Sequence, residues 1–251
     1  MSFLQTLILG GISGLTILLG LPIALLKLEA QKYLVFLNAL AIGILFFLFF
    51  DVTGHALEPI EHALKENGGY ASLIIANFVI GFGIGLLSLV YYGKRFPGKG
   101  GIPPKKLALL IAIGIGLHNF SEGLAIGNAS RSGELQFALM LIIGFGLHNI
   151  TEAFGIAAPL AGKKVGWLYL ILLGIIGGGP ITIGTLLGFT FTSDAIAVLF
   201  LSLAGGALVY VIAELLNAGR KLGFHIWNGW GLLAGFMMGV GTDLLLIALG
   251  A

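Results

Sequence analysis

The stretch GLHNFSEGLAIG, residues 116–127, places His, Asn and Glu inside a segment that is otherwise apolar. Thirty residues later the chain repeats the pattern as GLHNITEAFGIA, residues 146–157. Aligning residues 113–130 with residues 143–160 gives eight identities in eighteen positions. The polar residues therefore belong to a duplicated unit, and the apolar sequence around each copy decides the fold.

The composition around these two segments is that of a membrane protein. Of the 251 residues, 58% are hydrophobic and 10% are charged, whereas soluble domains carry about 25% charged residues. Several stretches contain no Asp, Glu, Lys or Arg: residues 1–26, 67–93, 165–193 and 222–242. Each is longer than the roughly 20 residues that cross a bilayer as a helix, and the alternating segments of about 10 residues typical of a β-barrel are absent. The sequence predicts an all-α membrane protein.

Hydropathy and turn residues divide the chain into eight candidate transmembrane helices. The first segment lacks the basic start and the small-residue cleavage site of a signal peptide, so we interpret it as a retained span. The chain contains no cysteine, which excludes disulfides, thiolate metal sites and cysteine nucleophiles. The predicted spans lie near residues 3–26, 33–57, 71–92, 105–129, 134–161, 166–190, 194–217 and 226–249.

Basic residues alternate between the connections. The connections after the first, third, fifth and seventh spans hold eleven of them: Lys27, Lys32, Lys94, Arg95, Lys99, Lys105, Lys106, Lys163, Lys164, Arg220 and Lys221. The other connections hold only Lys65 and Arg131. Because cytoplasmic loops carry the excess of Lys and Arg, we expect both termini to lie outside. His225 is expected at the inner interface.

The domain organisation is expected to be simple. We interpret residues 1–251 as a single transmembrane transporter domain without a soluble domain. The basic, Gly/Pro-rich segment at about residues 93–104 is its cytoplasmic linker. Glycines around Pro180, in the middle of the sixth span, predict a kink or a close backbone approach there.

The repeated polar residues have the spacing of metal ligands. Residues three and four apart share a helix face, so His118 and Asn119 face the same way as Glu122, and His148 and Asn149 the same way as Glu152. At about 1.5 Å per residue, His118 lies roughly 20 Å from Lys105, near the middle of the bilayer. Buried carboxylates there are costly unless a cation lies between them. Imidazole and carboxylate together suit Zn²⁺, Fe²⁺, Co²⁺ or Mn²⁺. One copy alone is explained equally well by an interhelical hydrogen bond, but two matched copies favour a metal site.

The two copies also point to a transporter. The fourth and fifth spans run in opposite directions, and polar groups of inverted repeats near mid-membrane are typical of transporter binding sites. The expected organisation is an inverted repeat of three, two and three helices.

A second polar group closes the second span. Asp51 and His55 are four residues apart on one face, at the end of the span that the charge pattern places outside. Glu58, Glu61 and His62 could form an attracting rim, although ordinary solvated residues explain these three better. Pro59 is expected to end the helix.

Three other functions compete with transport. A zinc protease would carry H-E-x-x-H, and a serine hydrolase G-x-S-x-G; neither string occurs. An intramembrane di-metal carboxylate enzyme would use Glu-x-x-His pairs, the reverse of the order here, and remains the alternative. A proton or monovalent-cation carrier would need the carboxylates but not the paired imidazoles.

The strings HNFSEG and HNITEA resemble the paired motifs of the ZIP (Zrt/Irt-like) family of divalent-metal transporters, in its fourth and fifth spans. The likeness extends to the eight spans, the outward termini and the loop after the third span. The D-x-x-x-H pattern of Asp51 and His55 also resembles the family's second span, and this resemblance implies that the two residues are ligands at the metal's entrance, on the outer side. It implies a binuclear site at mid-membrane with His118, Glu122 and Glu152 as primary ligands and His148 beside them. It further implies a second site from Asn119, Glu122, Asn149, Glu152 and a later glutamate, which falls on Glu214. An ion pair of Glu214 with Arg220 or Lys221 is the alternative there. Asp243, near the outer end of the last span, is expected to be a hydrogen-bonding partner rather than a ligand.

The chain departs from the family pattern at three places. Ser121 and Thr151 stand where many members have proline, so the helices are expected to bend less. Asn149 stands where some members have Asp, which leaves three carboxylates and predicts a weaker or unoccupied second site. The linker also lacks a histidine-rich stretch.

The sequence thus predicts a non-enzymatic transporter, without a resident cofactor, that moves Zn²⁺ or a related divalent ion into the cytoplasm. The expected location is the plasma (inner) membrane, as a multi-pass protein. Its expected partners are metal ions and the lipid bilayer, not nucleic acid, and a homodimer is left open.

Overall fold

The computed structural model describes residues 1–26, 30–65, 69–94, 102–191, 193–223 and 226–249. Lys27, Arg95, Lys99 and His225, and with them most of the linker at 93–104, lie outside the described residues. All regular structure within the described part is helical. The elements are α1 (Phe3–Leu15), α2 (Ile17–Gly20), η1 (Leu21–Leu25), α3 (Gln31–Lys65), α4 (Tyr70–Gly93), α5 (Pro104–Arg131), α6 (Leu135–Ala157), η2 (Ala158–Leu160), α7 (Trp167–Gly178), α8 (Pro180–Thr190), α9 (Asp194–Leu222) and α10 (Ile226–Leu249).

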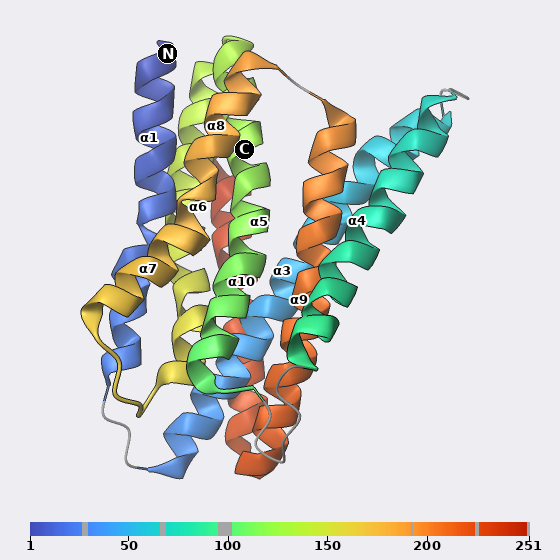
Figure 1. Ribbon diagram of the computed structural model, residues 1–251. Helices are drawn as coiled ribbons and strands as arrows, with labels where there is room; N and C mark the ends of the chain where they lie inside the picture. Colours follow the sequence, from blue (N-terminus) through green and yellow to red (C-terminus); the bar gives the residue numbers. More distant parts are fainter. Residues whose placement is uncertain (27–29, 66–68, 95–101, 192, 224–225, 250–251) are drawn as a thin grey trace.

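Each of the eight expected spans coincides with a helix or with helical segments in series. Seven of them are long and apolar enough to cross a membrane: Phe3–Leu25, Gln31–Lys65, Tyr70–Gly93, Pro104–Arg131, Leu135–Leu160, Trp167–Thr190 and Asp194–Leu222. The eighth expected span is α10, a single helix of 24 residues. The chain runs alternately up and down the bundle, so its two ends lie toward the same end of the molecule (Figure 1).

Two spans are interrupted. The predicted kink in the sixth span is confirmed, because α7 stops at Gly178 and α8 starts at Pro180. A proline has no N–H for the preceding turn, and Gly179 forms the joint between the two helices. The first span also changes character at Thr16, where α1 gives way to α2 and then to a 3-10 turn.

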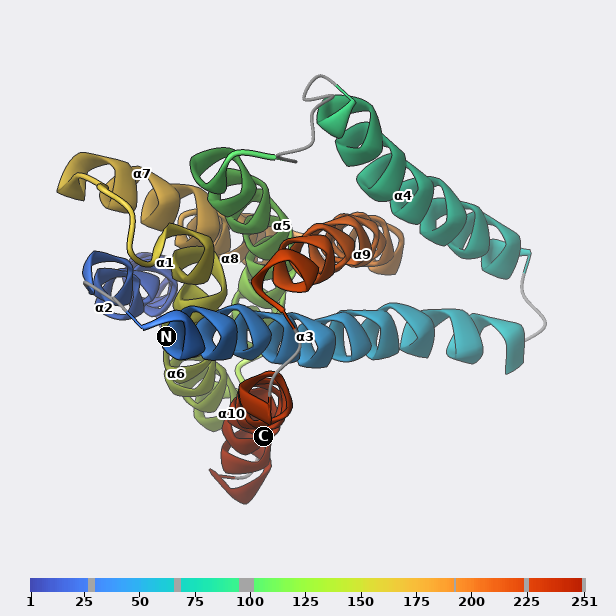
Figure 2. The same ribbon diagram turned by 90° about the horizontal axis from the view of Figure 1, so that it is seen from below.

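The prediction that Pro59 ends the second span is wrong, because α3 continues through it to Lys65. Proline removes one backbone hydrogen bond, but Ile60 and Ala63, beyond it, are buried against Ala71, Ile74 and Val198. This packing holds the last turns in place. With 35 residues, α3 measures about 50 Å, and it is strongly tilted in the bundle (Figures 1 and 2).

The helices form two neighbouring groups when the bundle is seen along its length. Packing is most extensive between α5 and α8, between α3 and α10, and between α4 and α9. Figure 2 shows α1, α5, α6, α7 and α8 together on one side, with α3, α4, α9 and α10 beside them. α5 and α6, which carry the repeated motifs, pack against each other.

Candidate metal centre

The repeated motifs place two imidazole–carboxylate pairs next to each other. His118 Nε2 lies 3.3 Å from Glu122 Oε1 on α5, and His148 Nε2 lies 3.4 Å from Glu152 Oε1 on α6. The two copies also meet, because His118 Nε2 is 3.8 Å from Glu152 Oε1. The predicted sharing of a helix face at i and i+4 is therefore confirmed for both copies.

These four side chains are buried and incompletely satisfied. Glu152 is 0% exposed, and His118, Glu122 and His148 are between 4% and 6% exposed. Both carboxylate oxygens of Glu152 and Oε2 of Glu122 lack a hydrogen-bond donor among the described residues. A buried, ionised carboxylate without donors costs several kcal/mol, so these carboxylates are stable here either protonated or beside a positive charge. A divalent cation would supply it: ligand atoms of His118, Glu122 and His148 all lie within 4.8 Å of one another.

The two asparagines beside the cluster bind each other. Asn119 Nδ2 donates to Asn149 Oδ1 at 2.5 Å and to the carbonyl of Gly177 at 3.0 Å. Asn149 Nδ2 donates to the carbonyl of Phe145 at 2.8 Å. Both side chains are 0% exposed. The amide pair thus bridges α5, α6 and the end of α7, and it engages the oxygen that Asn149 would otherwise offer to an ion.

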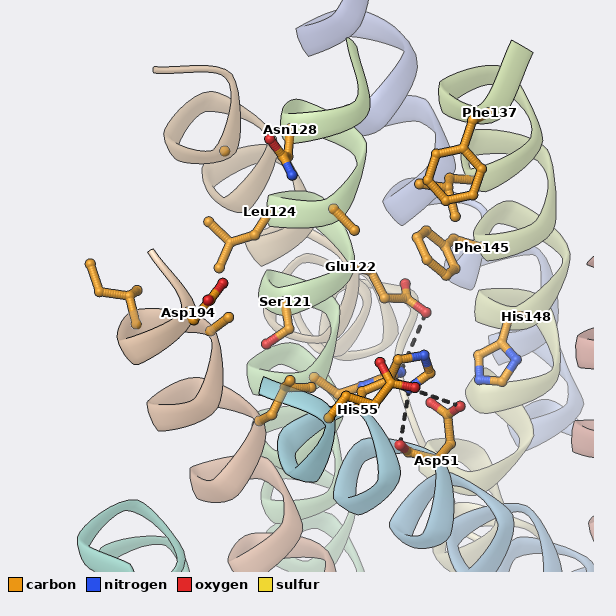
Figure 3. Close-up of a pocket in the computed structure, with 18 of the residues that line it drawn as sticks. Asp51, His55, Ser121, Glu122, Leu124, Asn128, Phe137, Phe145, His148 and Asp194 are labelled. Atoms are coloured by element: carbon orange, nitrogen blue, oxygen red, sulfur yellow. Dashed lines mark hydrogen bonds and ion pairs between the residues drawn. The ribbon is translucent and has the colours of Figure 1, made fainter. Parts of the chain in front are cut away.

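A cavity of about 640 Å³ leads to the cluster. His118, Glu122 and His148 line its buried part, and Asp51, His55 and Glu58 of α3 line it as well. Figure 3 shows Glu122, His148, Asp51 and His55 directed into this space. Other lining residues come from the ends of helices at one end of the bundle, among them Asn128, Phe137, Gly188, Phe191, Asp194 and Ile247. Several of these are exposed, so the cavity opens at that end.

Asp51 and His55 form the expected pair on α3. His55 Nδ1 lies 3.3 Å from Asp51 Oδ1, and the side chains are 59% and 18% exposed respectively. The prediction that they share a face is confirmed, and both line the same cavity as the cluster. They lie nearer to solvent than the four residues of α5 and α6.

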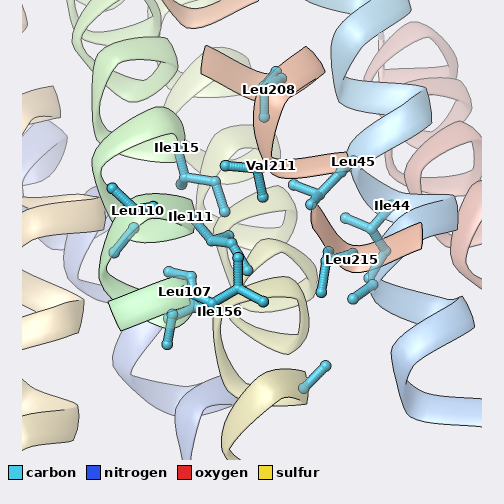
Figure 4. Packing of buried hydrophobic residues seen from close by; sticks show 14 of the residues in the cluster. Ile44, Leu45, Leu107, Leu110, Ile111, Ile115, Ile156, Leu208, Val211 and Leu215 are labelled. Carbon is cyan, nitrogen blue, oxygen red and sulfur yellow. The ribbon is translucent and has the colours of Figure 1, made fainter. Parts of the chain in front are cut away.

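On the opposite side of the cluster the helices are closed by aliphatic packing (Figure 4). Ile111 and Ile115 precede His118 on α5, and Ile156 follows Glu152 on α6. All three are 0% exposed, and they belong to one buried cluster with Leu45 of α3 and Val211 of α9. Ile156 and the two α5 isoleucines therefore separate the polar cluster from the end of the bundle that carries Lys105.

Comparison with known proteins identifies the chain. The profile of the family described as ZIP Zinc transporter matches residues 102–242, more than half of the sequence. The chain belongs to the ZIP family. The zinc transporter ZupT of Clostridium perfringens (strain 13 / Type A) is 36% identical over 169 residues, which cover 62% of this chain and 58% of that relative. The matched part therefore spans less than two thirds of that relative's length.

Membership of the ZIP family agrees with the apolar segments of the structure. The described part of the sequence holds seven helical segments long and apolar enough to cross a bilayer, so the chain is a multi-pass membrane protein. The residues of HNFSEG and HNITEA, on which the resemblance rested, all lie within the matched range.

The structure does not bring Glu214 to the cluster. Glu214 is half-buried on α9 and does not line the cavity. Leu201, on the same helix, does line it, and Glu214 follows thirteen residues later, about 20 Å along the helix. In this conformation the position carried over from the family pattern therefore stands apart from the imidazole–carboxylate cluster.

Two residues of α10 were not expected at the site. Asp243 lines the cavity, and the hydroxyl of Thr242 lies 3.0 Å from His148 Nδ1. A lone threonine in an apolar helix gives no signal of such a contact in the sequence. The pattern of α10 alone does not indicate which of its faces meets α6.

Proposed function

We propose that this ZIP protein transports divalent transition-metal ions, with Zn²⁺ as the principal substrate and Fe²⁺, Co²⁺ and Mn²⁺ accepted by the same ligand types. The observation that carries the proposal is the pair of buried imidazole–carboxylate faces at the base of a cavity open at one end. The relative's printed name, a zinc transporter, supports the choice of ion.

The ion would exchange its water for ligands of both copies of the motif. His118 and His148 each present Nε2, and Glu122 and Glu152 each present a carboxylate, within a few ångströms of one another. Divalent zinc prefers such nitrogen and oxygen ligands. Because the carboxylates lack donors, the ion would offset the cost of burying them.

We infer that the site holds one ion at a time. The second site implied by the family pattern would need oxygens of Asn119 and Asn149, and the Asn149 oxygen accepts a hydrogen bond from Asn119. Glu214 lies away from the cavity. The hydrogen bond between the two amides therefore engages one of the oxygens that a second ion would need, and only the Asn119 oxygen is left without a partner among the described residues.

The positions of the lysines support an orientation of the chain in the membrane. Four of the described lysines at the closed end lie over aromatic rings: Lys32 over Tyr33 and Trp227, Lys94 over Tyr91, Lys105 over Tyr169 and Lys106 over Tyr92. Tyr and Trp are enriched at both membrane–water interfaces, and an excess of Lys at one end is typical of the cytoplasmic side. The cavity opens at the other end, so this conformation would face outward, with both termini outside.

Ions would then move inward. An ion would pass Asp51 and His55, bind the cluster, and leave toward the cytoplasm once the aliphatic layer of Ile111, Ile115 and Ile156 opens. Release past Glu214 would suit its place on the lysine-bearing half of α9. Uptake through the plasma membrane is the expected role.

Zn²⁺ uptake by proteoliposomes containing the purified full chain tests the proposal. The wild-type chain should accumulate Zn²⁺, and Glu152→Gln should reduce uptake to the level of empty liposomes. Glu134→Gln, the same chemical change at an exposed residue of the α5–α6 connection, is the matched control and should transport normally. Undiminished uptake by Glu152→Gln would refute the proposed site.

A further inference from the structure

The two histidines of the cluster differ in the hydrogen-bond partner of Nδ1, the ring nitrogen that does not face the carboxylates. His148 Nδ1 lies 3.0 Å from the hydroxyl oxygen of Thr242 on α10. His118 Nδ1 is buried and has no hydrogen-bond partner among the described residues. The duplicated motif is therefore asymmetric, and the copy on α6 is tied to a third helix.

The surroundings of Thr242 decide the direction of this hydrogen bond. Its Oγ1 lies 2.7 Å from the carbonyl oxygen of Gly239 and 3.3 Å from that of Met238. Two oxygens 2.7 Å apart require a proton between them, and a hydroxyl has only one proton to give. Thr242 therefore donates to Gly239 and accepts from His148, whose Nδ1 must carry hydrogen.

A neutral imidazole protonated at Nδ1 has its lone pair on Nε2. That nitrogen lies 3.4 Å from Glu152 Oε1 and is buried without a hydrogen-bond partner among the described side chains. The ring also packs against Phe47, with ring centres 5.9 Å apart. The contact with Thr242 therefore fixes both the tautomer and the orientation that a metal ligand needs.

We propose that Thr242 is a positioning residue, which holds His148 so that its Nε2 points at the transported ion. Thr242 acts through His148 and does not touch the ion itself. Partners of this kind on the far nitrogen of a ligating histidine orient the ring, and their loss commonly weakens metal binding by about 10–100-fold. The inference rests on the proposed transport of divalent ions.

Replacing Thr242 by Val keeps the shape of the side chain and removes the hydroxyl. We expect Thr242→Val to weaken Zn²⁺ binding by about tenfold or more and to raise the KM of uptake with little change in kcat. Thr242→Ser, which restores the hydroxyl, should recover both. Isothermal titration of the purified full chain with Zn²⁺, and uptake by proteoliposomes, give the two readouts.

Thr190→Val is the matched control. Thr190 also donates its hydroxyl to carbonyls three and four residues earlier, at 2.8 Å and 3.2 Å, but it lies at the exposed end of α8. It should bind Zn²⁺ as the wild type does. This comparison separates the loss of the His148 contact from the loss of a hydroxyl bonded within its own helix.

A third measurement needs no variant. Long-range ¹H–¹⁵N spectra of the Zn²⁺-loaded wild-type chain should show His148 bound through Nε2 and protonated at Nδ1. Binding through Nδ1, or Zn²⁺ affinity of Thr242→Val equal to that of the wild type, would overturn the role of Thr242 alone. A wild-type chain that binds no Zn²⁺ would overturn the proposed function, and this inference with it.

Discussion

Replacing Glu152 by Gln removes one negative charge from the cluster and keeps the size of the side chain. Glu152 is 0% exposed and approaches both histidines, at 3.4 Å and 3.8 Å. Removing one partner of a buried charge pair typically costs about 3–5 kcal/mol. Applied to the interaction with Zn²⁺, the lower value corresponds to a loss of affinity of roughly a hundredfold.

The loss of Zn²⁺ affinity can be measured as a smaller effect of Zn²⁺ on thermal stability. At a free Zn²⁺ concentration 100 times the wild-type Kd, binding stabilises the folded protein by about 2.7 kcal/mol. With a hundredfold weaker Kd, the same Zn²⁺ would stabilise Glu152→Gln by only about 0.4 kcal/mol. Thermal unfolding in detergent should therefore show a clear Zn²⁺-dependent rise in Tm for the wild type and almost none for the variant, with Na⁺ inactive for both.

The same experiment distinguishes a metal-ligand role of Glu152 from a purely structural one. If Glu152 served only to join α5 and α6, Glu152→Gln would lower the Tm without Zn²⁺ and still gain the full shift with it. An equal Zn²⁺-dependent shift in both proteins would therefore refute Glu152 as a ligand. Glu134→Gln should behave as the wild type, because Glu134 is exposed and outside the cavity.

Three further predictions follow from other parts of the cavity. Asn149→Asp adds a third carboxylate beside Glu122 and Glu152, and one of its oxygens stays free while the other accepts from Asn119, so bound Zn²⁺ measured by elemental analysis should rise from one to two ions per chain; a ratio still at one would contradict the single-ion explanation. Asp51→Asn should raise the KM for Zn²⁺ by up to about fivefold with kcat unchanged, because partly exposed pairs contribute at most about 1 kcal/mol; a lost kcat would instead place Asp51 in the transport step. The chain has no cysteine, so Ala125→Cys, in the cavity, should react with an impermeant maleimide added outside, whereas Ile115→Cys, in the aliphatic layer, should not. Reaction at both positions would contradict the closed inner side.

Most of the fold could be predicted because the signals are local. Long apolar runs bounded by charges fix where helices begin and end to within a few residues, and only α3 ran clearly longer than expected. The cluster could be predicted because i and i+4 share a helix face and both copies use the same register. Antiparallel neighbours with matched registers bring His118 within reach of Glu152.

The rest depended on how helices are rotated and packed, which single segments do not encode. The continuation of α3 past Pro59 could not be predicted, because the turns beyond it are held by contacts with residues of other helices. The expectation that Glu214 is a metal ligand came from the family pattern. The distance of Glu214 from the cavity becomes clear only from the structure, in which Leu201 of the same helix lines the cavity and Glu214 does not. Thr242 meets His148 because α10 packs against α6, and no spacing within α10 indicates this.

In the duplicated segment, the positions that supply polar ligands differ from the positions that pack against neighbouring helices. The two copies share His, Asn and Glu but differ at positions 123 and 127, where the second copy has Ala153 and Ala157. A Cβ at Gly123 would collide with the carbonyl oxygen of Ile181, and one at Gly127 with that of Thr185, so glycine lets α5 approach α8 closely. At the α6–α2 contact the glycine lies on the other helix: α6 carries Ala153, and a Cβ on Gly20 of α2 would collide with it. The shared His, Asn and Glu are therefore residues with which α5 and α6 face each other, and the residues at positions 123 and 127 and their counterparts face different neighbours. Two similar motifs can therefore lie in different surroundings. For this reason the repeat alone does not predict that Thr242 contacts His148 while His118 has no such partner among the described residues.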